Sequence, residues 1–245
     1  MGKTRNWTRD ETILAVELYC RTSFGRIHSK NIEIIDLAKK IERTSNSVAL
    51  KMANFASLDI TLDRAGMGNH SKLDSAIWAE FFENPDLFLE KAIDIANKYS
   101  YAQEDKDTDP ASGFREGGEY EVVAKARKNQ DYFRQMVLAA YNVKCAITGI
   151  DSPELLIASH ITPWSVNKLS RTDPRNGICL NALHDKAFDR GLLSIDDNFK
   201  VLLSKKLAST HKFFDKYAGK KISLPNRFLP SLDFIRFHRE QIFIG

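Results

Sequence analysis

Two histidines and an asparagine, His160, Asn176 and His184, have residue types and a spacing suited to phosphate chemistry. The sequence around them predicts a short strand ending at His160, a polar loop, a second strand and a helix that carries His184. A neutral imidazole can act as a general base or bind a divalent cation, and an amide can hold a loop in place. We therefore expect phosphodiester hydrolysis, with His160 as base, His184 as metal ligand and Asn176 as the residue that orients the loop.

The segments SHITPW (159–164) and NGICLNALHDKAFDRG (176–191) resemble the HNH nuclease family. The resemblance covers roughly residues 120–205 and implies a ββα-metal fold that cuts nucleic acid, usually DNA, with Mg²⁺ or another divalent ion. It implies the same roles for the three residues, products with a 5′ phosphate and a 3′ hydroxyl, and a setting in restriction or defence against foreign DNA. Such a site cuts one strand at a time, so double-strand cleavage would need a homodimer or two sequential nicks.

The second protein ligand of the metal is a point of departure from the family pattern. Ser159 stands where many members have an acidic residue or a histidine beside the base. Asp185 and Asp189 are the candidates to replace it. Ideal helical geometry points Asp189 away from His184, so Asp189 is a ligand only if the helix unwinds before Gly191. Its alternative role is a salt bridge or a contact with the helix end.

The cysteines give no reason to expect a structural zinc ion. Many HNH proteins have two CxxC pairs, whereas here Cys145 is followed by Thr148 and the second pair retains only Cys179. A four-ligand zinc site is therefore not expected, and both cysteines should be small buried hydrophobic residues. With three cysteines in the chain, no even set of disulfides is indicated either.

The N-terminal residues 1–62 predict a tri-helical module in which a tight turn precedes the third helix, as in a helix-turn-helix. Helical periodicity directs Ser47, Lys51 and Asn54 to solvent, and we expect Lys51 and Asn54 to contact DNA. A plain three-helix bundle, or a module that docks another protein, remains the alternative. The first helix should begin at Thr8, because Glu11 completes a capping box.

The whole chain is predicted to be α+β, with this helix-turn-helix-like module followed by a ββα-metal HNH nuclease domain. A helical connector (63–101) and an acidic linker (102–119) separate them, and the nuclease domain (120–245) should begin with a short strand and have its core at about 130–205. Residues 1–62 and 119–245 are basic, whereas 63–118 are acidic, which suits a polyanionic partner at both ends.

Basic residues between the two site strands, Lys168, Arg171 and Arg175, are expected to contact the DNA backbone. The chain has 245 residues and is 43% hydrophobic and 28% charged, which is typical of a folded globular protein. The N-terminus lacks the apolar core of a signal peptide, and no apolar run reaches the roughly 18 residues that span a bilayer, so a cytoplasmic protein without a membrane partner is expected. A DNA-binding protein with an inactive nuclease domain, or an RNA-directed nuclease, are the alternative functions.

Overall fold

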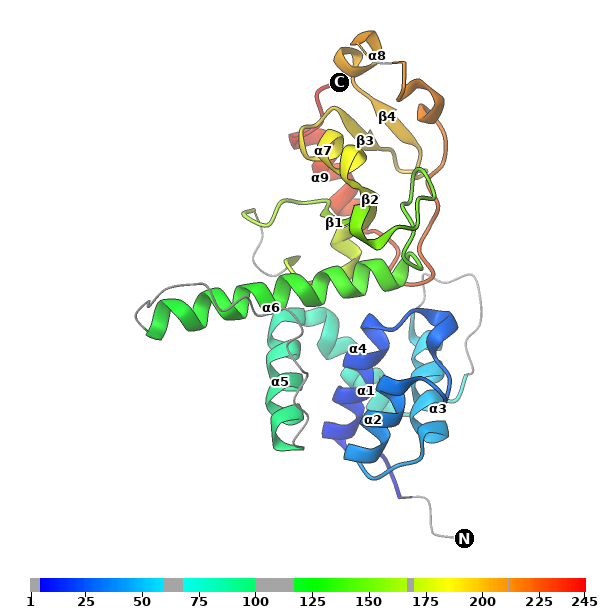
Figure 1. Cartoon of the computed structure of the whole chain (residues 1–245), viewed down its shortest axis with the longest axis vertical. Coiled ribbons are helices and arrows are strands. Elements are labelled where there is room, and N and C mark those ends of the chain that lie inside the picture. Colours follow the sequence, from blue (N-terminus) through cyan, green and yellow to red (C-terminus); the bar gives the residue numbers. More distant parts are fainter. Residues whose placement is uncertain (1–4, 60–67, 100–116, 167–169, 211) are drawn as a thin grey trace.

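The computed structural model describes residues 5–59, 68–99, 117–166, 170–210 and 212–245. A helical body formed by the N-terminal residues lies on one side of a long helix, α6 (Gly117–Ala140), and the C-terminal part lies on the other (Figure 1). The α+β fold class predicted from the sequence is confirmed. Buried apolar side chains from both parts form one continuous cluster, so the core runs across α6.

Five helices form the helical body: α1 (Arg9–Arg21), α2 (Ile32–Lys40), α3 (Ser45–Phe55), α4 (Lys72–Glu83) and α5 (Pro85–Lys98). The capping box at the start of α1 is confirmed, because the Thr8 hydroxyl accepts from the Glu11 amide and the Glu11 carboxylate accepts from the Thr8 amide. Helix α1 lies at the centre and packs against each of the other four helices. The helices of the predicted connector therefore pack directly on the tri-helical module.

The prediction that α3 exposes Lys51 and Asn54 to solvent is wrong. Lys51 and Asn54 are buried, at 7% and 9% exposure. Lys51 forms an ion pair with Asp74 on α4, and the Asn54 amide donates to the backbone oxygen of Asn69. The segment that leads into α4 thus covers the side chains that were expected to reach DNA, and neither is free to bind a phosphate.

The C-terminal part is built around a two-stranded antiparallel hairpin and the helix that follows it. Strands β1 (Leu156–His160) and β2 (Gly177–Asn181) pair so that His160 lies opposite Gly177, and α7 (Ala182–Asp189) follows β2 directly. These three elements confirm the predicted strand–loop–strand–helix order. A second hairpin, β3 (Leu193–Ile195) and β4 (Val201–Leu203), and the helices α8 (Lys205–Thr210) and α9 (Leu232–Gln241) complete this part.

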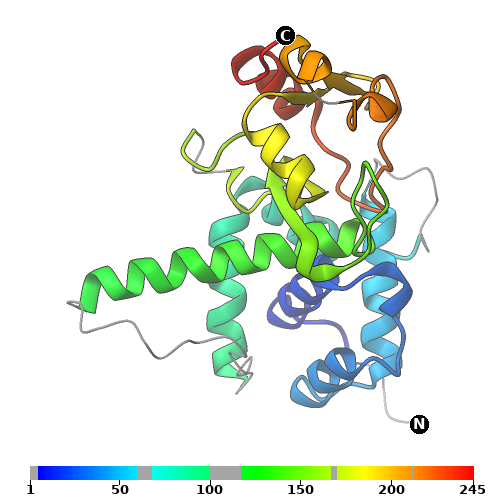
Figure 2. The same cartoon turned by 45° about the horizontal axis from the view of Figure 1, so that its top comes forward.

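Helix α6 supports the hairpin from below, as Figure 2 shows. The strand predicted at 120–127 is wrong, because these residues belong to α6. Gly177 is required for the close packing of β2 on α6. A Cβ atom at this position would lie 2.3 Å from Val137 Cγ2 and 2.9 Å from Phe133 Cζ, closer than any normal contact.

A buried arginine joins the C-terminal part to the helical body a second time. Arg227 is 1% exposed, and its guanidinium donates to the backbone oxygens of Tyr19 and Thr22 at the end of α1. The next residue, Phe228, donates its amide to the Asp59 carboxylate and packs its ring among the aromatic side chains of α4. The chain therefore returns to the helical body after the second hairpin. None of the helices in the described residues has the length and apolar character needed to cross a bilayer.

Candidate active site

A pocket of about 510 Å³ opens between β1, α7 and α9. His160 at the end of β1 lines it, together with Asp185 and Asp189 from α7. The three side chains come from the two segments whose sequences predicted chemistry. The pocket thus places an imidazole and two carboxylates around one cavity.

The His160 ring is fixed in both position and tautomer. It stacks on Phe133 of α6, with ring centroids 3.9 Å apart, and its Nε2 lies 2.9 Å from the backbone oxygen of Arg171. Since a carbonyl only accepts, Nε2 carries the proton and Nδ1 keeps its lone pair. Burial lowers the pKa of His160, with the Arg171 carbonyl and Asp189 acting in the opposite direction. The histidine is therefore held neutral near pH 7, in the form that accepts a proton.

Asn176 holds the loop between the two strands closed. Its side chain is 1% exposed. Its Oδ1 accepts from the Thr162 amide at 2.8 Å, and its Nδ2 donates to the backbone oxygens of Thr162 at 3.1 Å and Ser170 at 3.2 Å. The residue thus ties both ends of the loop that carries the Arg171 carbonyl. This geometry supports the orienting role expected from the sequence.

Asp185 and Asp189 lie on the same face of α7, because residues four apart are separated by about 40° around a helix. Burial raises the pKa of both carboxyl groups, and the charge of Asp189 further raises that of Asp185. Two carboxylates whose pKa values are raised by burial, on one face of a helix in a partly buried pocket, form a suitable site for a cation. Asp185 and Asp189 were both candidates from the sequence, and their four-residue spacing was the signal for a shared face.

His184 does not reach this pocket. It lies on another face of α7, fully buried, with its ring against Phe214 and Tyr217 at centroid distances of 5.3 and 5.0 Å. Burial, and then the charge of Lys216, lower its pKa to about 4. The geometry therefore separates His184 from His160 and does not support the expected role of metal ligand, whereas Asp189 faces the pocket without any unwinding of the helix.

Instead, His184 belongs to a hydrogen-bonded cluster that joins α7 to the turn after α6. Its Nδ1 lies 2.9 Å from Asn181 Oδ1, which also accepts the His184 amide as the cap of α7. Asn181 in turn donates its side-chain amide to the Thr148 hydroxyl and its backbone amide to the sulfur of Cys145. Residues 145 and 148 form one pair and residues 181 and 184 form another, with the same spacing of three residues. Hydrogen bonds join the two pairs.

The arginines of the site loop are largely engaged within the protein. Arg171 donates to the Trp164 backbone oxygen and stacks on the Trp164 ring, and Arg175 pairs with Asp173 and covers the Phe82 ring of α4. Lys168 lies outside the described residues. The DNA contacts expected of these residues stay predictions.

The helical body also contacts the site loop directly. The buried Thr172 hydroxyl donates to the Asp86 carboxylate of α5 at 2.7 Å. Thr172 directly follows Arg171, whose carbonyl holds His160.

A second histidine that lines the pocket, His238 of α9, has a structural role. It is 1% exposed; Nε2 lies 3.1 Å from the Phe188 backbone oxygen and Nδ1 lies 2.9 Å from the Ser194 hydroxyl. Its ring stacks on Phe188. With both nitrogens engaged, His238 fixes α9 against the end of α7.

The pocket fits a hard divalent cation that is shared with a phosphate. Within the described residues, no three His, Cys, Asp or Glu side chains form a metal-binding group on their own. Mg²⁺ typically uses one or two carboxylates and completes its shell with water and substrate phosphate. Asp185 and Asp189 supply such a pair, so they are the residues that would hold the ion.

Comparison with known proteins agrees with the architecture of this segment. The sequence profile of the HNH endonuclease family matches residues 145–196, which include β1, β2 and α7. Among solved structures, the chain is similar to a modification-dependent TagI restriction endonuclease, with 24% sequence identity, a TM-score of 0.33 and 45% of the chain covered. The chain spans 37% of the length of that structure. No curated protein matches the sequence. Over residues 145–196 the chain is therefore similar to the HNH endonuclease family.

Proposed function

We propose that the chain is a metal-dependent endonuclease that hydrolyses DNA phosphodiester bonds, with His160 as the general base. The observation that carries this proposal is the state of the His160 ring. Its Nε2–H is used by the Arg171 carbonyl, so the Nδ1 lone pair is the group left to accept a proton. A water molecule beside Nδ1 would lose its proton to His160 as it attacks the phosphorus.

The two carboxylates of α7 support the second half of the reaction. Asp185 and Asp189 lie in the same pocket as His160 and would hold a divalent cation. When bound, such a cation neutralises the phosphate and stabilises the 3′ oxygen that leaves. Asn176 acts indirectly on the deprotonation of water by His160, because it holds the loop whose Arg171 carbonyl orients the imidazole.

Plasmid nicking tests this assignment. Supercoiled plasmid, unmodified or carrying modified bases, is incubated with Mg²⁺, Mn²⁺ or EDTA, and nicked and linear products are measured. The variant His160→Ala should reduce nicking by roughly 10²–10⁴-fold, the contribution of a positioned base. The variant His28→Ala, which alters an exposed histidine of the helical body, is the matched control and should cut normally.

Four further results decide the details. Asp185→Asn and Asp189→Asn should each weaken the response to added Mg²⁺, whereas His184→Gln should not change it. Full nicking by His160→Ala would refute the assignment of the base. DNA that is bound but uncut under every metal would favour the inactive alternative, and cleavage of RNA alone would favour an RNA-directed nuclease.

A further inference from the structure

The C-terminal part carries a group of exposed lysines that the pocket does not use. Between Asp197 and Asp233 the sequence has seven lysines and one arginine but a single acidic residue, Asp215. All seven lysines are exposed, whereas the arginine is the buried Arg227. We refer to the seven together as the lysine surface: Lys200, Lys205, Lys206, Lys212, Lys216, Lys220 and Lys221.

The backbone brings lysines of this surface face to face. Lys200 and Lys221 are partners in an antiparallel bridge, and the Val201 amide donates to the Lys220 backbone oxygen. Like charges directly opposite each other across two strands destabilise the pairing. Within the described part of the chain, no carboxylate forms an ion pair with Lys200, Lys220 or Lys221; the nearby Asp197 is engaged by Arg236 and Arg239. Their ammonium groups thus remain accessible to an external anion.

Aromatic rings support the surface without neutralising it. The Lys216 ammonium lies 4.8 Å from the centre of the Phe213 ring and 4.9 Å from that of Tyr217. Phe213 itself is 49% exposed. A hollow of about 210 Å³ lies beside Tyr217, Lys220 and Lys221. A cation–π contact positions an ammonium while its full charge remains available, which suits contact with an anionic polymer.

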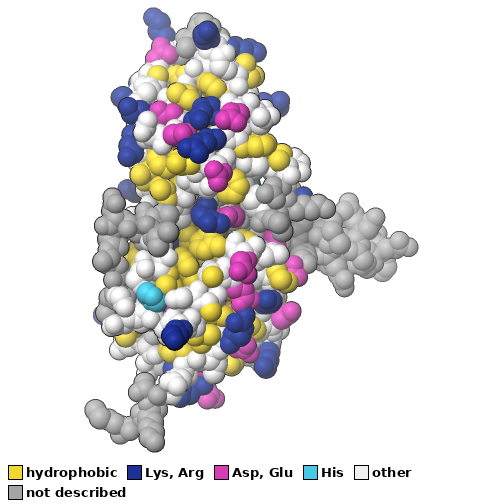
Figure 3. Space-filling model, turned by 180° about the vertical axis from the view of Figure 1, so that it is seen from behind, with side chains coloured by type: hydrophobic (Ala, Val, Ile, Leu, Met, Phe, Trp, Pro, Cys, Tyr) yellow, Lys and Arg dark blue, Asp and Glu magenta, His cyan; other side chains and the backbone are white. Residues whose placement is uncertain are grey.

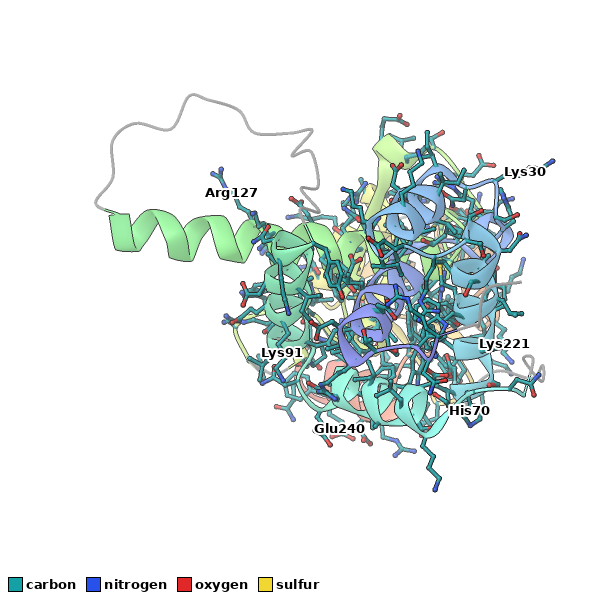
Figure 4. The ribbon with its side chains drawn as sticks, turned by 90° about the horizontal axis from the view of Figure 1, so that it is seen from below. Lys30, His70, Lys91, Arg127, Lys221 and Glu240 are labelled. Atoms are coloured by element: carbon teal, nitrogen blue, oxygen red, sulfur yellow. The ribbon has the colours of Figure 1, made fainter. Side chains whose placement is uncertain are left out.

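The lysine surface lies at the end of the molecule that is farthest from the helical body. Figure 1 shows α8 and β4 at this end, and Figure 3 shows lysine and arginine side chains along the same edge. Lys221, labelled in Figure 4, lies on the side opposite to the projecting end of α6. Lys220 and Lys221 line the smaller hollow. Within the described residues, the lysine surface contributes no side chain to the pocket of His160.

We propose that the lysine surface binds the phosphate backbone of double-stranded DNA, as a contact separate from the pocket that contains His160. The inference rests on the proposed function, in which DNA is the substrate. Duplex DNA carries one negative charge per roughly 1.7 Å of its axis, so a row of lysines gains affinity by releasing its counterions. Such contacts carry no sequence information. The surface would raise affinity for any duplex and leave the chemistry to the pocket.

The experiment compares DNA binding at several salt concentrations in the full chain carrying His160→Ala, so that the probe stays intact. The probe is a short DNA duplex, and an RNA duplex of the same length and anionic phospholipid vesicles are tested beside it. The test variant combines Lys216→Gln, Lys220→Gln and Lys221→Gln. Each lost phosphate contact should reduce the slope of log K against log salt by about 0.9, so the slope should fall by about 3. At low salt the affinity should fall by about tenfold or more.

Two controls separate a local surface from general charge. The first combines Lys30→Gln, Lys39→Gln and Lys72→Gln, which removes the same charge from exposed positions on the helical body. The second replaces the three test lysines with arginine and should bind as the parent does. Thermal unfolding should be unchanged in all variants, because every altered side chain is exposed.

The outcomes are decisive in both directions. A reduced slope in the test variant alone supports the lysine surface. The inference is overturned if the test variant binds DNA like its parent, if the helical-body control loses as much affinity, or if the lysines bind an RNA duplex or anionic vesicles but not DNA. Nicking by the chain with His160 intact is scored separately. A chain that binds DNA through these lysines without ever cutting it would overturn the proposed nuclease and support the inference.

Discussion

Replacing Asn176 with alanine should damage both stability and catalysis. The substitution removes an amide that is 1% exposed and makes three hydrogen bonds. Its partners are the Thr162 amide, the Thr162 carbonyl and the Ser170 carbonyl, in residues that are themselves 4% and 5% exposed. Alanine offers none of these groups a replacement. Each loses its partner unless the loop opens to water.

The magnitude follows from the number of partners. Leaving a buried polar group unsatisfied costs about 1–3 kcal/mol, so three such groups give a cost of about 3 kcal/mol at the lower limit. Opening of the loop would reduce the cost in stability but would displace the Arg171 carbonyl that holds His160. In that case we expect the loss to appear in catalysis, up to the roughly 10²–10⁴-fold that a positioned base contributes.

Two assays read out the two costs. Urea denaturation gives the change in the free energy of unfolding, and plasmid nicking under saturating and limiting DNA separates kcat from KM. Asn46→Ala, at an exposed position on α3, is the matched control and should change stability by less than about 0.5 kcal/mol. Asn176→Asp keeps the acceptor for the Thr162 amide but sets a charge against two carbonyl oxygens, and should be no better than alanine. An Asn176→Ala protein that loses under about 1 kcal/mol and retains full kcat would refute the role of this amide.

Three other predictions follow from the same geometry. Gly177→Ala should cost about 1–3 kcal/mol by overpacking against Val137 and Phe133, and should reduce nicking because Phe133 supports the His160 ring; a variant with unchanged melting and activity would contradict this. The kcat/KM for nicking should rise with pH with a midpoint below pH 6.5, because burial lowers the pKa of His160 and the base works in its neutral form; a midpoint above 6.5 would be inconsistent with the structure. The free energy of unfolding should decrease as pH falls from 6.5 to about 4, because His184 and His238 have pKa values of about 4 when folded and the unfolded chain therefore binds more protons in this range. The loss should be on the order of 3 kcal/mol per histidine. Urea midpoints that stay constant from pH 7 to 4.5 would count against this prediction.

Local sequence patterns predicted the elements around the site well. Strands β1 and β2 and helix α7 lie where short apolar segments and the HNH-like motif indicated, and Gly191 has the positive φ of 64° expected just after a helix. The capping box at Thr8 was predictable for the same reason. In each case the determining residues are neighbours in the chain.

The predictions that failed depend on contacts between residues far apart in the sequence. Lys51 is buried because Asp74, on another helix, pairs with it. Three polar residues, His184, Asp185 and Asp189, share a helix of only eight residues, and only the packing of α7 against β1 decides which of them face the pocket. Residues 120–127 include the β-branched Val122 and Val123, which favour a strand locally, although the segment belongs to a 24-residue helix.

The double attachment of the C-terminal part to the helical body has a consequence for where the proposed nuclease would cut. Helix α6 enters this part while packed on α1, and Arg227 and Phe228 return to the helical body after the second hairpin. A part of the chain that is attached at two places cannot rotate about a flexible linker. Any DNA held by the helical body would therefore lie at one fixed distance from His160. Cuts would then fall at a single distance from the DNA held by the helical body rather than over a range of positions.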